Sequence, residues 1–260
     1  MRFLLAFVLT GFGVLGATVD VPVELARPAR DWALFGVDLA LPGFLANPAT
    51  LGFAGDWRFD STCSSLFGVG QVWAVSLVGP VVGGAATLLD SSGIGADLSY
   101  RVWAFQLGVG IPFGRVGIGG KARLLRPVAP KESWGWSVDL GFFWAGPIEL
   151  GLVAESLFAA SPYSGETWAR DLSVAASLSY SFPRFFGALG LAFTDIFTVP
   201  TWAVAGEVDF GVLALRAGLR STGLCVGGGV QFRGMVLDWV FTLHPDLPQS
   251  FRVSFGLRWP

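Results

Sequence analysis

Residues 250–259 of the chain read SFRVSFGLRW, and a large apolar side chain occupies every second position from Phe251 to Trp259. The positions between them carry Arg, Ser, Gly and Arg. Residues 236–243, VLDWVFTL, show a similar alternation around Asp238. Successive side chains of a β-strand point to opposite faces, so a period of two predicts strands with two chemically different faces.

The same period recurs upstream in three further stretches, which are residues 133–144, 171–180 and 212–220. In each stretch one face is mainly Leu, Val, Phe and Trp, and the other is mostly Gly, Ala and Ser with a few charges. A soluble β-sandwich would carry many charged residues on its outer face, and this second face has too few. A lumen lined by small and polar residues, with the bulky row in lipid, explains both faces. We therefore predict an all-β fold, a transmembrane antiparallel β-barrel.

The composition also favours a membrane protein. Of the 260 residues, 53% are hydrophobic and 14% are charged, whereas about a quarter of an ordinary soluble domain is charged. Such hydrophobicity excludes a disordered chain, and the net charge of −2 offers no basic field for a nucleic-acid partner. One uncharged stretch, residues 66–89, is long enough for a membrane helix, but it contains Pro80 and several glycines. One such span does not predict a helical membrane protein.

The number of strands follows from the length of the alternating region. If the barrel comprises residues 53–260, about 14 strands of roughly 9–11 residues fit with tight turns, and 12 strands fit with longer loops. Pro and Gly predict turns at residues 78–80, 91–93, 111–114, 145–147, 182–184, 199–200 and 221–223. The segments best suited to form a lid are residues 126–133 and 159–167.

The N-terminal residues have the layout of a secretory signal peptide. Met1 and Arg2 precede an uncharged apolar run that ends in Gly16 and Ala17, and this run is too short to span a bilayer. We expect residues 1–17 to be cleaved during export and the barrel to reside in the bacterial cell outer membrane; an N-terminal membrane anchor is the alternative. Residues 18–52 do not alternate as the later strands do, and they predict either a structural cap or a plug.

Catalytic and metal chemistry find little support in the sequence. His244 is the only histidine, and Cys63 and Cys225 are the only cysteines. No cluster of Cys and His suited to zinc exists, and the single histidine stands in a turn with no serine beside it in a recognised motif. We therefore expect no enzyme activity, no metal and no cofactor. The two cysteines either pair or serve as small apolar residues. His244 is expected to be a turn residue.

Charged residues within the predicted strands are expected to face the lumen, because a charge in lipid is costly. They serve either to brace the interior by pairing with one another or to contact a solute. These lumen-facing candidates are Asp97, Lys121, Arg123, Asp139, Asp171, Glu207, Asp209, Arg216 and Asp238.

Several short motifs occur in a characteristic order. ANPATL (residues 46–51) precedes the glycine-rich strands, and the chain closes with LALRAGLR (213–220), GLCVGGGVQFRGMVLDWVF (223–241) and HPDLPQSFRVSFGLRW (244–259). This order resembles the PorV/PorQ family of outer-membrane proteins, which is similar to the FadL-type transporters of hydrophobic compounds. The resemblance matches Asn47, Pro48 and Ala49 to the family's NPA motif in the plug. Two departures are the final Trp259 and Pro260, where a terminal aromatic residue is usual, and the short chain, which leaves little room for large extracellular loops.

The resemblance implies two functions. The first is passage or uptake of small hydrophobic molecules through a lumen plugged by the N-terminal segment. The alternative is a PorV-like secretion accessory that binds exported proteins, and a purely structural barrel is a third reading. The partners expected are outer-membrane lipid and either a small hydrophobic ligand or a secreted protein.

Overall fold

A computed structural model describes residues 27–43, 45–66, 70–91, 101–128, 133–162, 168–246 and 248–260. The predicted signal peptide and Asp97 lie outside the described residues, as do most of the two segments considered for a lid.

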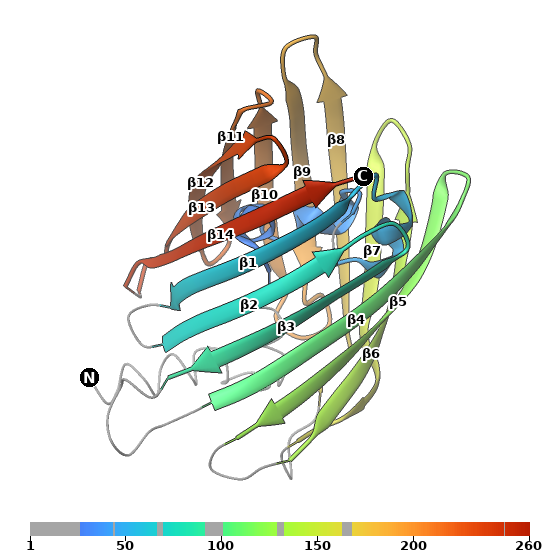
Figure 1. Ribbon diagram of the computed structural model, residues 1–260. Helices are drawn as coiled ribbons and strands as arrows, with labels where there is room; N and C mark the ends of the chain where they lie inside the picture. The colour runs from blue at the N-terminus through green and yellow to red at the C-terminus, as the bar shows by residue number, and fades with distance from the viewer. Residues whose placement is uncertain are drawn as a thin grey trace.

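Fourteen antiparallel strands close into a barrel (Figure 1). Each strand pairs with its sequence neighbours, and β1 pairs with β14 to complete the ring. This confirms the predicted fold class and the strand number of 14. The strands are β1 (Trp57–Leu66), β2 (Gly70–Val78), β3 (Val82–Asp90), β4 (Arg101–Phe113), β5 (Val116–Pro127), β6 (Gly135–Trp144), β7 (Glu149–Ala160), β8 (Asp171–Ser181), β9 (Phe186–Thr194), β10 (Thr201–Asp209), β11 (Leu213–Arg220), β12 (Gly223–Phe232), β13 (Met235–Leu243) and β14 (Ser250–Trp259).

The two faces of the sheet have the chemistry that the alternation predicts. Phe255 is 44% exposed on the outer face, whereas its neighbour Ser254 is 1% exposed on the inner face. On β13, Leu237 is likewise exposed while Asp238 is buried. The outer surface of the barrel is therefore an apolar belt suited to lipid, and the small and charged residues face inward.

The two ends of the barrel differ in the length of their connections. At the end where β1 begins and β14 finishes, the connections are short: residues 79–81, 114–115, 145–148, 182–185, 210–212 and 233–234. The opposite end carries the longer ones, including residues 91–100 and 161–170. We call these the short-turn end and the long-loop end. In outer-membrane barrels the short turns are periplasmic and the longer loops extracellular.

The apolar stretch 66–89, which the sequence analysis did not take as evidence of a helical membrane protein, contains β2 and most of β3. No helix among the described residues is long and apolar enough to cross a membrane. One expectation from the sequence needs correction. The predicted turn at 111–114 is misplaced, because β4 continues to Phe113. The pairing of β3 with β4 stops at Val109. Pro112 is tolerated beyond that point because its missing N–H faces the side on which β4 has no partner strand. On its other side, Pro112 still pairs with Gly117 of β5.

The N-terminal segment lies inside the barrel (Figure 1). We call residues 27–53 the plug. It contains three short helices, α3 (Ala29–Ala33), η1 (Val37–Ala40) and η2 (Pro48–Phe53). Helix α3 packs on β11–β14, η1 on β7–β10 and η2 on β3–β6, so each helix covers its own arc of the inner wall.

Glycines on the inner wall allow the plug to approach the strands closely. A Cβ on Gly151 would lie 1.9 Å from the carbonyl oxygen of Leu39, and one on Gly141 would lie 2.2 Å from Oδ1 of Asn47. Both distances are far below van der Waals contact. The abundance of glycine on the inner face therefore reflects contact with the plug as well as the shape of the sheet.

The outward orientation of the bulky row gives a first prediction. Phe255→Arg places a charge in the middle of β14 on the lipid side, and it should lower the free energy of unfolding by roughly 2–4 kcal/mol relative to Phe255→Leu. Denaturant titration of both variants in liposomes measures this. Equal stability of the two variants would show that this face does not meet hydrocarbon.

Close packing of the plug gives a second prediction from two adjacent glycines. A Cβ at Gly119 would lie 2.5 Å from the backbone N of Ala49, whereas the nearest atom to a Cβ at Gly120 is 3.9 Å away. Gly119→Ala should therefore loosen η2 and speed amide exchange there by about tenfold, in line with an overpacking cost of roughly 1–3 kcal/mol. Hydrogen-exchange mass spectrometry checks this, with Gly120→Ala as the control that leaves the exchange unchanged.

Candidate functional site

The NPA residues anchor the plug at its η2 end. The buried Asn47 side chain donates from Nδ2 to the carbonyl oxygens of Leu39 (2.8 Å) and Phe142 (3.0 Å), and its Oδ1 accepts from the backbone N of Ala49 (3.1 Å). Pro48 follows as the first residue of η2, where no backbone N–H is needed. Asn47 thus joins η1, η2 and β6, and its side chain is saturated with contacts inside the protein.

An ion-pair chain attaches α3 to the wall of β10–β13. Arg30 forms a bidentate pair with Glu207 on β10, at 2.7 and 2.9 Å. Glu207 also accepts from Nε of Arg216 on β11, and Arg216 Nη1 donates to Asp238 on β13 at 2.6 Å. The chain alternates in sign, so each buried charge has an opposite neighbour. We call these four residues the Glu207 chain.

A second group of polar contacts holds α3 to β1, β13 and β14. Arg58 Nη2 lies 3.2 Å from Asp31, and Arg58 Nε lies 2.6 Å from Asp60. The backbone N of Ala29 donates to Ser254 Oγ at 2.7 Å. Further along the helix, Trp32 Nε1 donates to Thr242 Oγ1 at 3.1 Å. Helix α3 is therefore held by side-chain hydrogen bonds and ion pairs as well as by apolar contacts of Ala29 and Ala33 with Cys225 and Val240.

A third cluster braces the wall at β5–β7. Arg123 Nη2 donates to Asp139 Oδ1 (2.7 Å) and to Ser156 Oγ (2.8 Å), and Lys121 Nζ lies 3.4 Å from Asp139. Ser156 sits in a bulge of β7 opposite Asp139 and has a φ of 53°. The bulge lets the backbone N of Ser156 donate to Asp139 at 2.9 Å. Lys121 also reaches the plug, because its Nζ donates to the carbonyl oxygen of Ala46 at 3.3 Å.

Six of the nine lumen-facing candidates belong to these clusters and are buried: Lys121, Arg123, Asp139, Glu207, Arg216 and Asp238. Asp171 and Asp209 lie at strand ends. Asp171 ties down the loop between β9 and β10 by accepting from the backbone N of Phe197 at 3.0 Å, and Asp209 accepts from Gly211 in a turn at 2.6 Å. Asp97 lies outside the described residues.

Sequence reasoning missed the partners on the plug and on β1. Arg30 and Asp31 stand in a segment without strand periodicity, so nothing in the sequence indicated which wall they face. Arg58 and Asp60 share the inward face of β1, but the outward positions Ser61 and Cys63 are also small or polar. The alternation that reveals the other strands is hidden there.

A group of apolar side chains lines the inner wall of β2–β5 toward the long-loop end. We call it the inner apolar patch; its members are Val72, Ala74, Val102, Ala104 and Leu125, with Trp168 from the connection between β7 and β8. Trp168 Nε1 donates to the carbonyl oxygen of Ala160 at 3.1 Å, and the Arg123 guanidinium lies 5.1 Å from the Trp168 ring. The patch contrasts with the glycine-rich and charged inner wall elsewhere.

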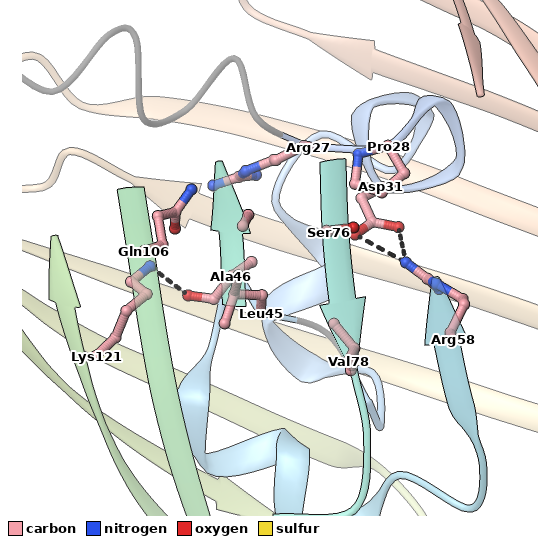
Figure 2. A pocket seen from close by; sticks show the side chains of 11 residues that line it. Arg27, Pro28, Asp31, Leu45, Ala46, Arg58, Ser76, Val78, Gln106 and Lys121 are labelled. Carbon is pink, nitrogen blue, oxygen red and sulfur yellow. Dashed lines mark hydrogen bonds and ion pairs between the residues drawn. The ribbon is translucent and has the colours of Figure 1, made fainter. Parts of the chain in front are cut away.

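A cavity of about 20 Å³ lies between the plug and the wall of β1–β5 (Figure 2). This cavity has room for water-sized species.

The cysteines and the histidine lie apart from these clusters. Cys63 is exposed on the outer face, while Cys225 is buried on the inner face, and both thiols are free. Nδ1 of His244 accepts from the backbone N of Asp246 at 3.1 Å within a turn. Among the described residues no group of His, Cys, Asp and Glu side chains is arranged to hold a metal ion.

Comparison with known proteins shows the class of fold. No family model and no curated protein matches the chain. A solved FadL homologue of Pseudomonas aeruginosa superposes with a TM-score of 0.54 at 9% identity, covering 89% of this chain and 98% of the other. The outer membrane protein Omp33 of Acinetobacter baumannii superposes with a TM-score of 0.52 at 6% identity, covering 80% of this chain and 100% of the other. The chain therefore has the fold of outer-membrane β-barrel proteins.

Asp31 gives the site a testable pH dependence. Burial, assisted by the nearby Asp38 and Asp60 and opposed by Arg58, raises the pKa of its carboxyl to about 6. A carboxyl whose pKa is raised on folding binds protons more tightly in the folded state, so its stabilising contribution grows as the pH falls from 7 toward 5 and is lost as the pH rises through 6.

Between pH 7.5 and pH 5, the wild type should therefore gain about 1 kcal/mol of unfolding free energy relative to Asp31→Asn. Denaturant titration of both proteins at the two pH values measures the difference. If the difference in unfolding free energy between the two proteins is the same at both pH values, or if the wild type loses stability relative to Asp31→Asn at pH 5, the role of Asp31 is contradicted.

Proposed function

We propose that this barrel passes small hydrophobic molecules across the bacterial outer membrane and that the plug closes its lumen at rest. The observation that carries the proposal is a lumen filled by a segment whose α3 end is attached through exchangeable polar contacts. Breaking the Glu207 chain and the Asp31–Arg58 pair would weaken the hold on α3, which keeps its contacts with Ser254, Thr242 and the apolar cluster. It would leave the sheet folded, because none of these side chains takes part in the backbone ladder.

The inner apolar patch supports hydrophobic molecules as the class that passes. It lies on the inner wall toward the long-loop end, which faces outward if the short turns are periplasmic. The members of the patch are buried in the structure, so a hydrophobic solute would contact this apolar wall once the lumen opens. The resemblance to the PorV/PorQ and FadL-type proteins points to the same class, and export through a cleaved signal peptide at residues 1–17 is part of this proposal.

Two chemically similar substitutions test the plug as the barrier. Glu207→Gln leaves Arg30 and Arg216 without their shared carboxylate inside the lumen, and losing one partner of a buried pair costs about 3–5 kcal/mol. Flux of a small hydrophobic dye into proteoliposomes should therefore rise at least about tenfold over wild type. Asp209→Asn makes the same charge change at the rim of β10, away from α3, and should leave the flux unchanged.

Deletion of residues 18–52 completes the experiment. Absence of flux in both the full chain and the folded deletion variant contradicts a channel. Co-purification of one defined secreted protein with the full chain, together with no flux, would instead favour the secretion-accessory function. A barrel that shows neither result is structural.

A further inference from the structure

The short-turn end carries exposed arginines at the tips of its hairpins. Arg115 lies between β4 and β5, Arg184 between β8 and β9, and Arg233 between β12 and β13. None of the three guanidinium groups forms a hydrogen bond or an ion pair with another described residue. Arg233 lies over the ring of Phe232, with 5.1 Å between the guanidinium carbon and the ring centroid. These three cations are therefore available to a partner outside the chain.

Carboxylates at the same end do not neutralise these arginines. Asp209 accepts from the backbone N of Gly211 in its own turn, and Glu149 accepts from two serines of β8 on the inner wall. Asp56, just before β1, is the remaining exposed carboxylate side chain on the described part of this rim. The exposed charges of the rim are therefore mainly positive, which attracts anions.

Exposed arginines at the long-loop end have partners in the chain. Arg101 pairs with Asp90 at 2.7 Å, and Arg220 lies 3.5 Å from Asp195. Arg170 is an exposed arginine of this end that forms no such pair with the described side chains. A set of unpaired guanidinium groups thus distinguishes the short-turn rim.

Each arginine of the rim stands within two residues of a phenylalanine on the lipid side. Phe113 is 62% exposed, Phe182 is 44% exposed and Phe232 is 58% exposed. Phe182 also stacks in an aromatic group, in which its ring centroid lies 4.3 Å from that of Tyr180. Aromatic rings of this kind lie at the edge of the hydrocarbon, so the neighbouring guanidinium groups reach the level of the lipid headgroups.

The arginines are too far apart to share one small ligand. Four strands separate the β4–β5 turn from the β8–β9 turn, and four more lead to the β12–β13 turn. Adjacent strands lie about 4.8 Å apart, so successive arginines are roughly 19 Å apart along the ring. A small anion reaches one of them, whereas a lipid leaflet that surrounds the barrel offers a phosphate group to each.

We propose that the short-turn rim binds the headgroups of anionic phospholipids, with Arg115, Arg184 and Arg233 each contacting a headgroup phosphate. The planar guanidinium group matches two phosphate oxygens at once. With the short turns in the periplasm, these lipids belong to the inner leaflet of the outer membrane. Contacts at three points of the ring fix the depth of the barrel in the bilayer. The surface lies outside the lumen, so it does not depend on the proposed function.

Competition between two lipids tests this surface. The purified full chain in nonionic detergent is mixed with equal amounts of phosphatidylglycerol, which is anionic, and phosphatidylcholine, which is zwitterionic. Native mass spectrometry counts the lipids that the protein retains. We expect the wild type to retain phosphatidylglycerol in preference to phosphatidylcholine, because the net negative lipid gains more from the cationic rim.

Replacing all three arginines should remove this preference. The triple variant Arg115→Gln, Arg184→Gln and Arg233→Gln should lower the ratio of retained phosphatidylglycerol to phosphatidylcholine by at least about fivefold, since one arginine near an anionic surface accounts for about that factor. The single variant Arg184→Gln, measured beside it, should shift the ratio in the same direction. All three side chains are exposed, so the variants should keep the thermal unfolding midpoint of the wild type.

Arg170→Gln is the matched control. It removes the same charge from an exposed arginine at the long-loop end and should keep the wild-type lipid ratio. A second control adds inorganic phosphate at constant ionic strength, which should leave the retained phosphatidylglycerol in place.

Four results would overturn the proposal. They are equal retention of the two lipids by the wild type, an unchanged ratio in the triple variant, an equal loss in Arg170→Gln, and displacement of phosphatidylglycerol by inorganic phosphate, which would assign the arginines to a free anion. None of these measurements involves transport. Selective lipid retention by a barrel that passes no dye would leave the lipid surface standing and refute only the proposed function.

Discussion

The rest of the structure depends on closure of the sheet. Hydrocarbon offers no hydrogen bonds, so each backbone N–H and C=O within a bilayer must be bonded inside the protein. Pairing of β1 with β14, from Trp57 opposite Trp259 to Ser65 opposite Phe251, removes the last free edges. Once the ring is closed, every strand has one face toward lipid and one toward the lumen, and this division dictates where apolar and charged residues can stand.

The closed ring creates a second problem, which the plug solves. Inward-facing charges such as Glu207 and Asp139 cannot all be hydrated in a filled lumen, and an unpaired buried charge is costly. The plug adds partners to those that the wall supplies, as Arg30 does for Glu207 beside Arg216, while glycines on the wall admit its backbone. Packing at η2 is tight and neutral, whereas α3 combines ion pairs with apolar contacts. One segment therefore combines a firm anchor with an end whose contacts can be exchanged.

The strands were predictable because each carries its own signal. A period of two in residues 250–259 needs no knowledge of neighbours, and the division into lipid and lumen faces follows from residue size and charge. The sequence pattern misleads where the local preference of a residue differs from its place in the tertiary structure. Pro112 suggested a turn, yet it fits within β4 because β3 has already ended on that side. The small outward residues Ser61 and Cys63 of β1 concealed the alternation in which Arg58 and Asp60 take part.

The sequence by itself determined an all-β transmembrane barrel of about 14 strands, the faces of those strands and a separate N-terminal segment. Those features depend on patterns within ten or so consecutive residues. Only the tertiary structure decided that this segment lies inside the lumen and that Arg30 meets Glu207 across 177 positions of chain. Such contacts depend on how the ring closes around the plug, and no local periodicity encodes which distant charges will meet.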